Sequence, residues 1–251
     1  MTAPPPYDQF IIVPLRVHIL SAEDLPDIDC KLTDADVVRI VDKANGIWHM
    51  AGVHLGLESI VHEAAAHKDE FRTAVEKSGP DALKLYKLLR PQASLEFAGM
   101  HVYYIHRFAV NGVFVGEGVA FVHETASLRK VEGGIDEPIP RVTAHELGHA
   151  MGLSHRQDRT NLMASGTTGT LLNAAEVERV REHVRHAPGA MSATEAHEAA
   201  TNATKKGDAA TATRTWGWLA EIPGDGAEEA NGHLAGPPAP ATRQAAKAEA
   251  Q

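Results

Sequence analysis

Three histidines and one glutamate lie within eleven residues, in the stretch TAHELGHAMGLSHRQDRTNLMASG at 143–166. On an α-helix, residues four apart share a face, so the imidazoles of His145 and His149 can point at one ion. Gly152 can adopt the left-handed conformation that ends a helix, and the chain can then turn back and bring His155 to the same ion. Three neutral nitrogen ligands with an open fourth position are the arrangement of a catalytic zinc site.

Glu146 adjoins the first of these histidines, where its carboxylate can reach a water molecule beside the ion without being a ligand. A carboxylate in that position can act as a general base in metal-assisted hydrolysis. Coincidence is the alternative, because the chain contains 15 histidines. The short pattern H-E-x-x-H would arise by chance in roughly one such chain in twenty, whereas the pattern extended to His155 would arise in roughly a few in ten thousand. The sequence therefore predicts one zinc ion and a catalytic role for Glu146.

The extended pattern, followed by Met163 in NLMASG, resembles the signature of the metzincin zinc endopeptidases. The residues HELGHAMGLSH and their distance from Met163 resemble those of the matrixins. The resemblance implies that Met163 forms the methionine turn, an apolar floor beneath the histidines that is not itself a ligand. It also implies peptide-bond hydrolysis in which Glu146 takes a proton from the zinc-activated water and passes it to the leaving amine.

Several residues depart from the known subfamilies. Arg156 follows His155, where matrixins usually have serine and reprolysins aspartate. Ser165 replaces the matrixin proline two positions after the turn methionine, and the tyrosine of astacins and serralysins is missing from that position as well. The subfamily is therefore left open.

Other potential ligands have simpler interpretations. A structural calcium or second zinc ion is compatible with the resemblance, but no ligand set is assigned to either. We expect His101, His106 and His123 to be surface or hydrogen-bonded histidines. Cys30 is the single cysteine, which excludes an intrachain disulfide. It lacks the matrixin inhibitory motif and is expected to be a buried thiol rather than a metal-blocking thiolate.

Hydrophobic patterns predict the elements that must position this site. Strands are expected at 10–20, 53–61, 100–108 and 117–124, and helices at 32–52, around the histidine motif, and at 173–184. The resemblance implies an α/β fold of the α+β type, with a twisted mixed sheet, an active-site helix and a C-terminal helix. Its edge strand would lie over the cleft and bind extended substrate by backbone pairing. The strand at 117–124 follows the Asn111-Gly112 turn signal, and the resemblance implies that this is the edge strand, at about Gly118, Val119, Ala120, Phe121 and Val122.

The composition changes at Pro188, after which Ala, Thr, Glu and Gly dominate. We therefore expect a catalytic domain over residues 1–187 and a largely flexible tail over 188–251 that catalysis mostly does not need. The segment TWGWLAEIP at 215–223 is the exception, and it predicts a docked helix around 205–223. The tail is also a candidate binding surface for a protein partner.

Bulk properties exclude several classes of function. The net charge of −9 argues against a nucleic-acid partner, and no apolar stretch is long enough for a membrane span. Prolines interrupt the N-terminal apolar run, so no secretory signal is predicted. The expected location is the cytoplasm, with export by a leaderless route as the alternative.

Three functions are compatible with the motif. The first is a zinc-dependent endopeptidase acting on peptide or protein substrates. The second is a zinc-bearing peptide-binding module with little turnover, which Glu146 argues against because a binder needs no general base. The third is a zinc hydrolase of a non-protein amide, which a deep closed pocket in place of an open cleft would favour. The sequence does not predict the substrate, its preferred side chains, the activation mechanism or the oligomeric state.

Overall fold

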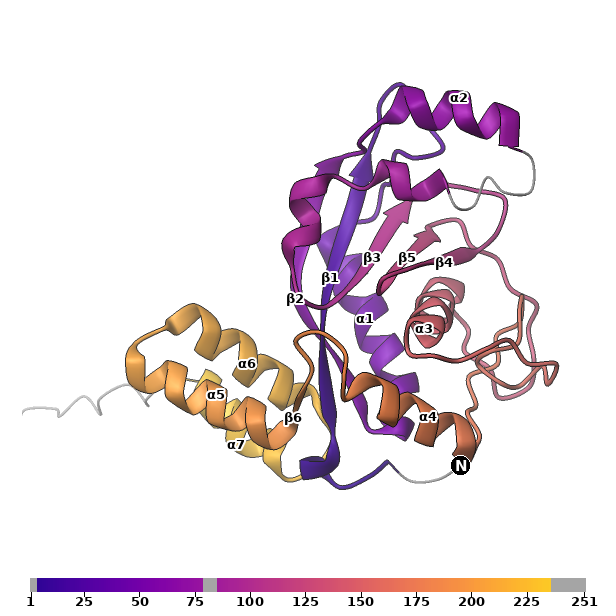
Figure 1. Ribbon diagram of the computed structural model, residues 1–251. Coiled ribbons are helices and arrows are strands. Elements are labelled where there is room, and N and C mark those ends of the chain that lie inside the picture. The colour runs from indigo at the N-terminus through magenta and orange to yellow at the C-terminus, as the bar shows by residue number, and fades with distance from the viewer. Residues whose placement is uncertain (1–3, 79–84, 236–251) are drawn as a thin grey trace, which may run out of the picture.

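The computed structural model describes residues 4–78 and 85–235, which form a mixed sheet with helices on its faces (Figure 1). The strand order is β2-β1-β3-β5-β4, and a short β6 pairs with β1. Strands β1, β2, β3 and β5 run parallel, whereas β4 is antiparallel to β5 and β6 to β1. The strands are β1 Ile11–Ser21, β2 Val53–Ala64, β3 Met100–Ile105, β4 Gly112–Gly116, β5 Val119–His123 and β6 Met191–Ser192. The predicted α/β fold with a mixed sheet is thus confirmed.

The helices occupy the connections between these strands and the C-terminal part of the chain. They are α1 Asp34–Trp48, α2 Lys68–Ser78, α3 Pro138–Ala150, α4 Ala174–Val184, α5 Ala193–Lys206, α6 Ala209–Glu221 and α7 Gly226–Leu234, with short 3-10 turns η1 Tyr7–Gln9, η2 His49–Ala51 and η4 Gln92–Glu96. Helix α1 begins with the capping box expected from Thr33 and Asp36. Among the described residues, no helix is both long and apolar enough to cross a membrane.

The side chains of β1 alternate between the two faces of the sheet, as a strand requires. On one face, Val13, Leu15 and Val17 pack with α1, α3 and α4 in the main hydrophobic core. On the opposite face, Leu20 joins a second cluster that includes Phe71 of α2. Because α3 lies over the sheet near β4 and β5, the main core fixes the position of the histidine motif relative to that end of the sheet (Figure 1).

The expected position of the edge strand is wrong. Strand β5, which contains Val119–Val122, lies between β3 and β4 and is buried, so β4 forms the edge instead. The hairpin between β4 and β5 turns at Gly116, Glu117 and Gly118, which all have positive φ values. The Asn111-Gly112 turn signal therefore lies at the start of a strand, β4, which the sequence patterns did not predict.

The expectation of a largely flexible tail is also wrong for residues 191–234. They form β6 and the helices α5, α6 and α7, which pack together beside the lower part of β1 and β2 (Figure 1). Trp216 and Trp218 are buried in a third hydrophobic cluster with Phe10, which precedes β1, and Ile12 of β1. The docked helix expected around 205–223 corresponds to α6. Residues 236–251 of the predicted tail lie outside the described residues.

Alanine spacing explains why this segment folds although its composition is unusual. Ala196, Ala200 and Ala203 form a buried stripe on α5, so the helices can approach closely. The indole of Trp218 lies against Gly56 of β2, where a Cβ atom would be 2.7 Å from the ring. Its Nε1 donates a hydrogen bond to the carbonyl oxygen of Leu57 at 3.0 Å. The large tryptophan side chains of α6, which pack beside β1 and β2, thus bury the apolar surface that the small alanine side chains do not supply.

Candidate metal centre

Helix α3 carries the first two histidines of the motif and is itself mostly buried. It begins with Pro138, a residue suited to the first turn because its missing N–H has no helical partner there. Nearly all of its residues from Pro140 to Gly148 are buried. Packing on both sides therefore fixes the helix, and the spacing of four residues places His145 and His149 on the same side of it.

The three histidines of the motif come together as predicted. One potential ligand atom from each of His145, His149 and His155 lies within 4.8 Å of the others. The Nε2 atoms of His149 and His155 are 3.1 Å apart. His145 is buried and His155 is exposed, so the cluster is open to solvent on one side.

Backbone carbonyls fix the orientation of two of these rings. The Nδ1 atom of His145 donates to the Leu162 carbonyl oxygen, and the Nδ1 atom of His149 donates to that of Leu153, both at 2.8 Å. A carbonyl oxygen only accepts, so each Nδ1 carries the proton and each Nε2 keeps its lone pair. Burial lowers the pKa of His145 to about 3 and also lowers the pKa of His149. Both imidazoles are therefore neutral at neutral pH and suited to bind a metal ion.

The turn after α3 has the geometry expected of the motif. Gly152 has φ +84°, a left-handed conformation that favours glycine, and α3 ends just before it at Ala150. The chain then returns, and the Arg156 N–H donates to the carbonyl oxygen of Met163 at 2.9 Å. This bond ties the residue after His155 to the methionine turn.

Arg156, which departs from the matrixin and reprolysin patterns, has a structural role. Its Nε donates to Glu176 Oε1 at 2.6 Å, and the other carboxylate oxygen of Glu176 accepts from the Asn161 side chain at 2.7 Å. Asn161 Oδ1 in turn accepts from the Met163 N–H at 2.7 Å. This network joins α4 to both ends of the loop that carries the methionine.

Met163 lies against the helix that carries the first two histidines, α3. It is fully buried, and its sulfur occupies the space over Gly148, where a Cβ atom would be only 2.7 Å from Sδ. Gly148 lies next to His149 in the sequence, so the methionine packs directly under the turn of α3 that carries the histidines. A larger residue in place of glycine would push these two elements apart.

Glu146 lies between α3 and the edge strand β4. A Cβ atom on Gly112 would be 2.8 Å from the Glu146 carboxylate, so the glycine in β4 provides the room for it. Burial raises the pKa of Glu146 to about 8, while a hydrogen bond from the Phe114 N–H and the charge of Arg141 oppose that rise. A buried carboxyl group with a raised pKa is a strong proton acceptor when ionised.

A pocket of about 590 Å³ contains all three histidines and Glu146. One of its walls is the β4 edge from Asn111 to Phe114, and others come from Leu128, Val142 and the Ser165–Gly166 segment. Of the residues predicted to bind substrate, Val119, Ala120, Phe121 and Val122 do not line it. Gly118 lines a neighbouring groove, which shares Phe114 and His149 with this pocket.

Sequence reasoning missed Arg141, which lines this pocket and is only 1% exposed. Its signal in the sequence is its position four residues before His145, which places both on one face of α3. Sequence reasoning also missed β4 because the Asn-Gly pair indicated a turn. The sequence signal for this strand was the run of three apolar residues between Gly112 and Gly116.

The remaining histidines and Cys30 do not join the centre. His101 contacts His18, His106 contacts Glu124, and His123 contacts Thr125, each through ring nitrogens within 3.0 Å of the partner. Cys30 is buried, its Sγ donates to Glu124, and burial raises its pKa to about 12. Within the part of the chain that the structure describes, the three histidines of the motif are the one group with metal-ligand spacing.

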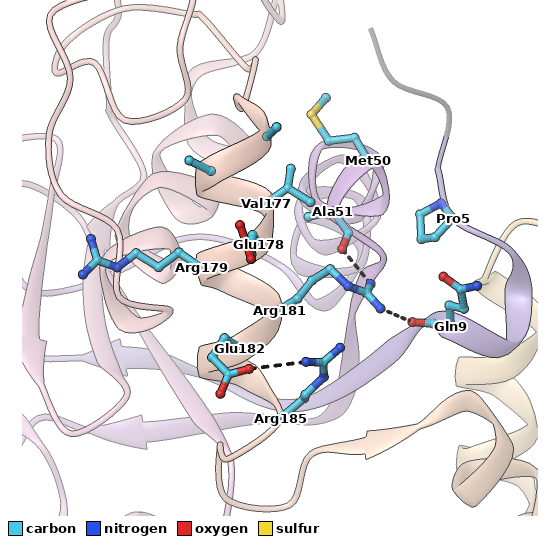
Figure 2. Close-up of a pocket in the computed structure, with 12 residues that line it drawn as sticks. Pro5, Gln9, Met50, Ala51, Val177, Glu178, Arg179, Arg181, Glu182 and Arg185 are labelled. Atoms are coloured by element: carbon cyan, nitrogen blue, oxygen red, sulfur yellow. Dashed lines mark hydrogen bonds and ion pairs between the residues drawn. The ribbon is translucent and has the colours of Figure 1, made fainter.

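A larger groove of about 940 Å³ lies elsewhere, between α4, η2 and the N-terminal segment (Figure 2). Arg181 crosses it and donates to the carbonyl oxygens of Ala51 at 3.0 Å and Gln9 at 2.9 Å. The groove shares no residue with the pocket around the histidines. Arg181 instead fixes the position of α4, the helix that also supports the methionine turn through Glu176.

The residues of the centre fit a zinc ion. Three Nε2 lone pairs converge, the opposite nitrogens of two rings are held by carbonyls, and the site is open on the side of His155. Structural zinc sites usually have four protein ligands, whereas three protein ligands with an open position are typical of catalytic zinc. Carbonyl acceptors for the distal ring nitrogen are likewise typical of metal-binding histidines.

Comparisons with known proteins find one matching family model and similar solved structures. The family model Peptidase_M10, matrixin, matches residues 84–179. One similar solved structure is archaemetzincin from Methanopyrus kandleri, with 15% identity and a TM-score of 0.44; the match covers 69% of this chain and 96% of that chain. Another is metalloproteinase-II from Bacteroides fragilis, with 12% identity and a TM-score of 0.38; the match covers 68% of this chain and 53% of that chain. No curated protein matches significantly. The matrixin match spans the histidine motif and Met163, so this part of the chain is similar to the matrixin metallopeptidases.

Proposed function

We propose that the chain is a zinc-dependent endopeptidase that hydrolyses peptide bonds within extended substrates. The observation that carries this proposal is the placement of Glu146 in the same pocket as three convergent histidines, along an edge strand. His145, His149 and His155 would hold the ion. A zinc ion bound there would supply a Lewis acid that acidifies water and polarises the scissile carbonyl group.

Glu146 acts as the general base in this proposal. Its carboxylate takes a proton from the attacking water and later gives it to the nitrogen of the leaving amine. Gly112 leaves the space that the carboxylate occupies, and the Phe114 N–H orients it. A nearby cation lowers the pKa of a carboxyl group, which counters the rise caused by burial and favours the ionised base.

The edge strand β4 supports a peptide as the substrate. Among the described residues it pairs with β5 on one side only, so the backbone groups of its other side are available for an added strand. The pocket lies along this edge and opens beside the exposed His155, an arrangement that favours an extended chain over a small amide in a closed pocket. A binding module without turnover has no need of Glu146.

The test of this function is digestion of a proteome-derived peptide library, with mass spectrometry of the products. We expect cleavage at internal bonds, loss of cleavage with a zinc chelator, and recovery when zinc is added back. A zinc-loaded protein that binds library peptides but cleaves none would support the binding module instead.

The metal content is a separate prediction. Because three neutral imidazoles converge, elemental analysis of the purified protein should find about one zinc per chain. The matched control is the double variant His106→Gln and His123→Gln, which removes two histidines outside the cluster and should leave the zinc content unchanged. Protein that contains no zinc and takes up none on addition would contradict the metal centre.

A further inference from the structure

Of the three histidines in the metal centre, His155 has the least support of its own. The rings of His145 and His149 lie on α3, and each donates from Nδ1 to a backbone carbonyl oxygen. His155 is exposed and lies on the loop after α3, and its Nδ1 has no hydrogen-bond partner within the described parts of the chain. The position of this ring therefore depends on the backbone that carries it.

Arg156, the next residue, makes two contacts that hold this backbone. Its N–H donates to the carbonyl oxygen of Met163 at 2.9 Å. Its Nε donates to Glu176 Oε1 at 2.6 Å. The first bond ties the loop to the methionine turn, and the second ties it to α4. Because Arg156 directly follows His155, both contacts act one residue away from the potential ligand.

Glu176 is a fixed anchor for the arginine side chain. It is only 1% exposed, and its second carboxylate oxygen accepts from the Asn161 side chain at 2.7 Å and from the Asn173 N–H at 2.9 Å. Burial acts to raise the pKa of Glu176, but the hydrogen bonds that it accepts outweigh this effect, and the pKa lies below its ordinary value. The anchor is therefore a buried carboxylate that is charged at neutral pH.

Helix α4, which carries this carboxylate, is fixed by contacts outside the histidine pocket. Val180 and Val184 of α4 are buried in the main hydrophobic core. Arg181 donates to backbone carbonyl oxygens of η2 and of the N-terminal segment (Figure 2). The position of Glu176 is thus set by the fold, and the carboxylate can transmit that position to the loop after α3.

We propose that Glu176 is a positioning residue that holds His155 at the zinc ion through Arg156, and so sets how tightly the zinc is bound. The inference rests on the zinc centre of the proposed function. Metal-binding histidines usually take this support from an acceptor at the second ring nitrogen, and loss of such support typically costs about 10–100-fold in metal affinity. Here the support passes through the neighbouring residue instead.

Arg156→Met tests the proposal through the affinity for zinc. It removes the bond to Glu176 and keeps the backbone bond to Met163. Competition with a chromophoric chelator should give a zinc dissociation constant about tenfold higher than that of the wild-type protein. The variant should still fold, because the arginine side chain is half-exposed. An unchanged zinc dissociation constant would overturn the proposal.

Two further variants assign the effect to the bond with Glu176. Arg159→Met makes the same replacement at an exposed arginine of the same loop and should keep the wild-type affinity. Arg156→Lys retains a cation that can reach the carboxylate and should recover most of the loss. With cobalt(II) in place of zinc, the visible absorption reports the coordination geometry, and only Arg156→Met should change it. Equal effects of the two methionine variants would overturn the proposal.

A double-variant cycle tests whether the arginine and the glutamate act as one unit. Glu176→Gln keeps the length of the side chain and its cap on α4, but it removes the charge. The double variant with Arg156→Met should raise the zinc dissociation constant by little more than the larger single change. Losses that multiply would overturn the role of Glu176. Should Glu176→Gln fail to fold, the comparison of Arg156→Met with Arg156→Lys and Arg159→Met still decides the question.

Zinc affinity separates this proposal from the proposed function, because it does not depend on cleavage. Wild-type protein that binds zinc but cleaves no peptide, together with a tenfold loss of affinity in Arg156→Met, would reject the endopeptidase and keep the positioning role. Cleavage by the wild-type protein, together with unchanged zinc affinity in Arg156→Met, would keep the endopeptidase and overturn the positioning role.

Discussion

Glu146→Gln should lower the turnover of a cleavable peptide by at least about 10²-fold, the lower range for loss of a general base. Glutamine has the same length and still accepts the Phe114 N–H, so the pocket keeps its shape, but its amide cannot take a proton from water. The three histidines are unchanged, and the zinc content should remain at that of the wild-type protein. Steady-state kinetics together with elemental analysis of the same sample measure both effects.

Two further variants show whether the loss is specific. His149→Ala should lose both activity and zinc, because two imidazoles hold the ion far less tightly than three. Glu178→Gln changes an exposed glutamate on α4, outside the histidine pocket, and should change neither property. Near-normal cleavage by zinc-loaded Glu146→Gln would show that another group accepts the proton.

A chain that ends at residue 187 should be largely unfolded or aggregated, contrary to the expectation from composition. It lacks the helices α5–α7 and so exposes Phe10 and Ile12 at the start of the chain's first strand, and it loses the indole that covers Gly56. Replacing one buried tryptophan by alanine costs about 3–5 kcal/mol. Losing both tryptophans and their helices should remove most of the roughly 5–15 kcal/mol by which domains are typically stable. Solubility and near-ultraviolet circular dichroism measure this outcome.

A chain that ends at residue 235 is the control, since it retains the three helices, and it should unfold like the full-length protein. Trp218→Ala is a milder form of the same change and should lower the free energy of unfolding, measured in urea, by about 3–5 kcal/mol. A soluble, cooperatively folding chain that ends at 187 and cleaves peptides would restore the original boundary. The helices α5, α6 and α7 would then not be needed for the rest of the chain to fold.

The centre itself was predictable because it is local. His145, His149 and Glu146 lie on one helix, and helical geometry alone determines which side chains share a face. His155 follows a glycine whose φ of +84° is open to few other residues. Spacing in sequence therefore corresponds directly to spacing in the structure, and the predicted meeting of the three histidines needs no knowledge of distant contacts. The proposed roles of these residues in binding and catalysis still await the experiments above.

Short sequence patterns do not predict the position of the edge strand. An Asn-Gly pair is a good turn former, yet the hairpin turns at Gly116–Gly118, and Gly112 begins the strand. The strand forms because its backbone pairs with β5 and because Gly112 accommodates Glu146 from α3. Both reasons are tertiary contacts, so local preference and final structure differ at this point.

Sequence patterns alone predicted the cluster of three histidines, the helices α1, α3 and α4, and the strands β1, β2, β3 and β5, because each follows from a periodic or closely spaced pattern. The tertiary structure decided which strand forms the edge, whether the alanine-rich tail folds, and what Arg141 contacts. Alanine helices gain stability only against a partner surface, here supplied by β1 and β2 through residues more than 150 positions away, as in the Trp218–Leu57 bond. The hydrogen bonds of Arg141 likewise form only when tertiary folding places the carbonyls of the 161–169 loop beside it.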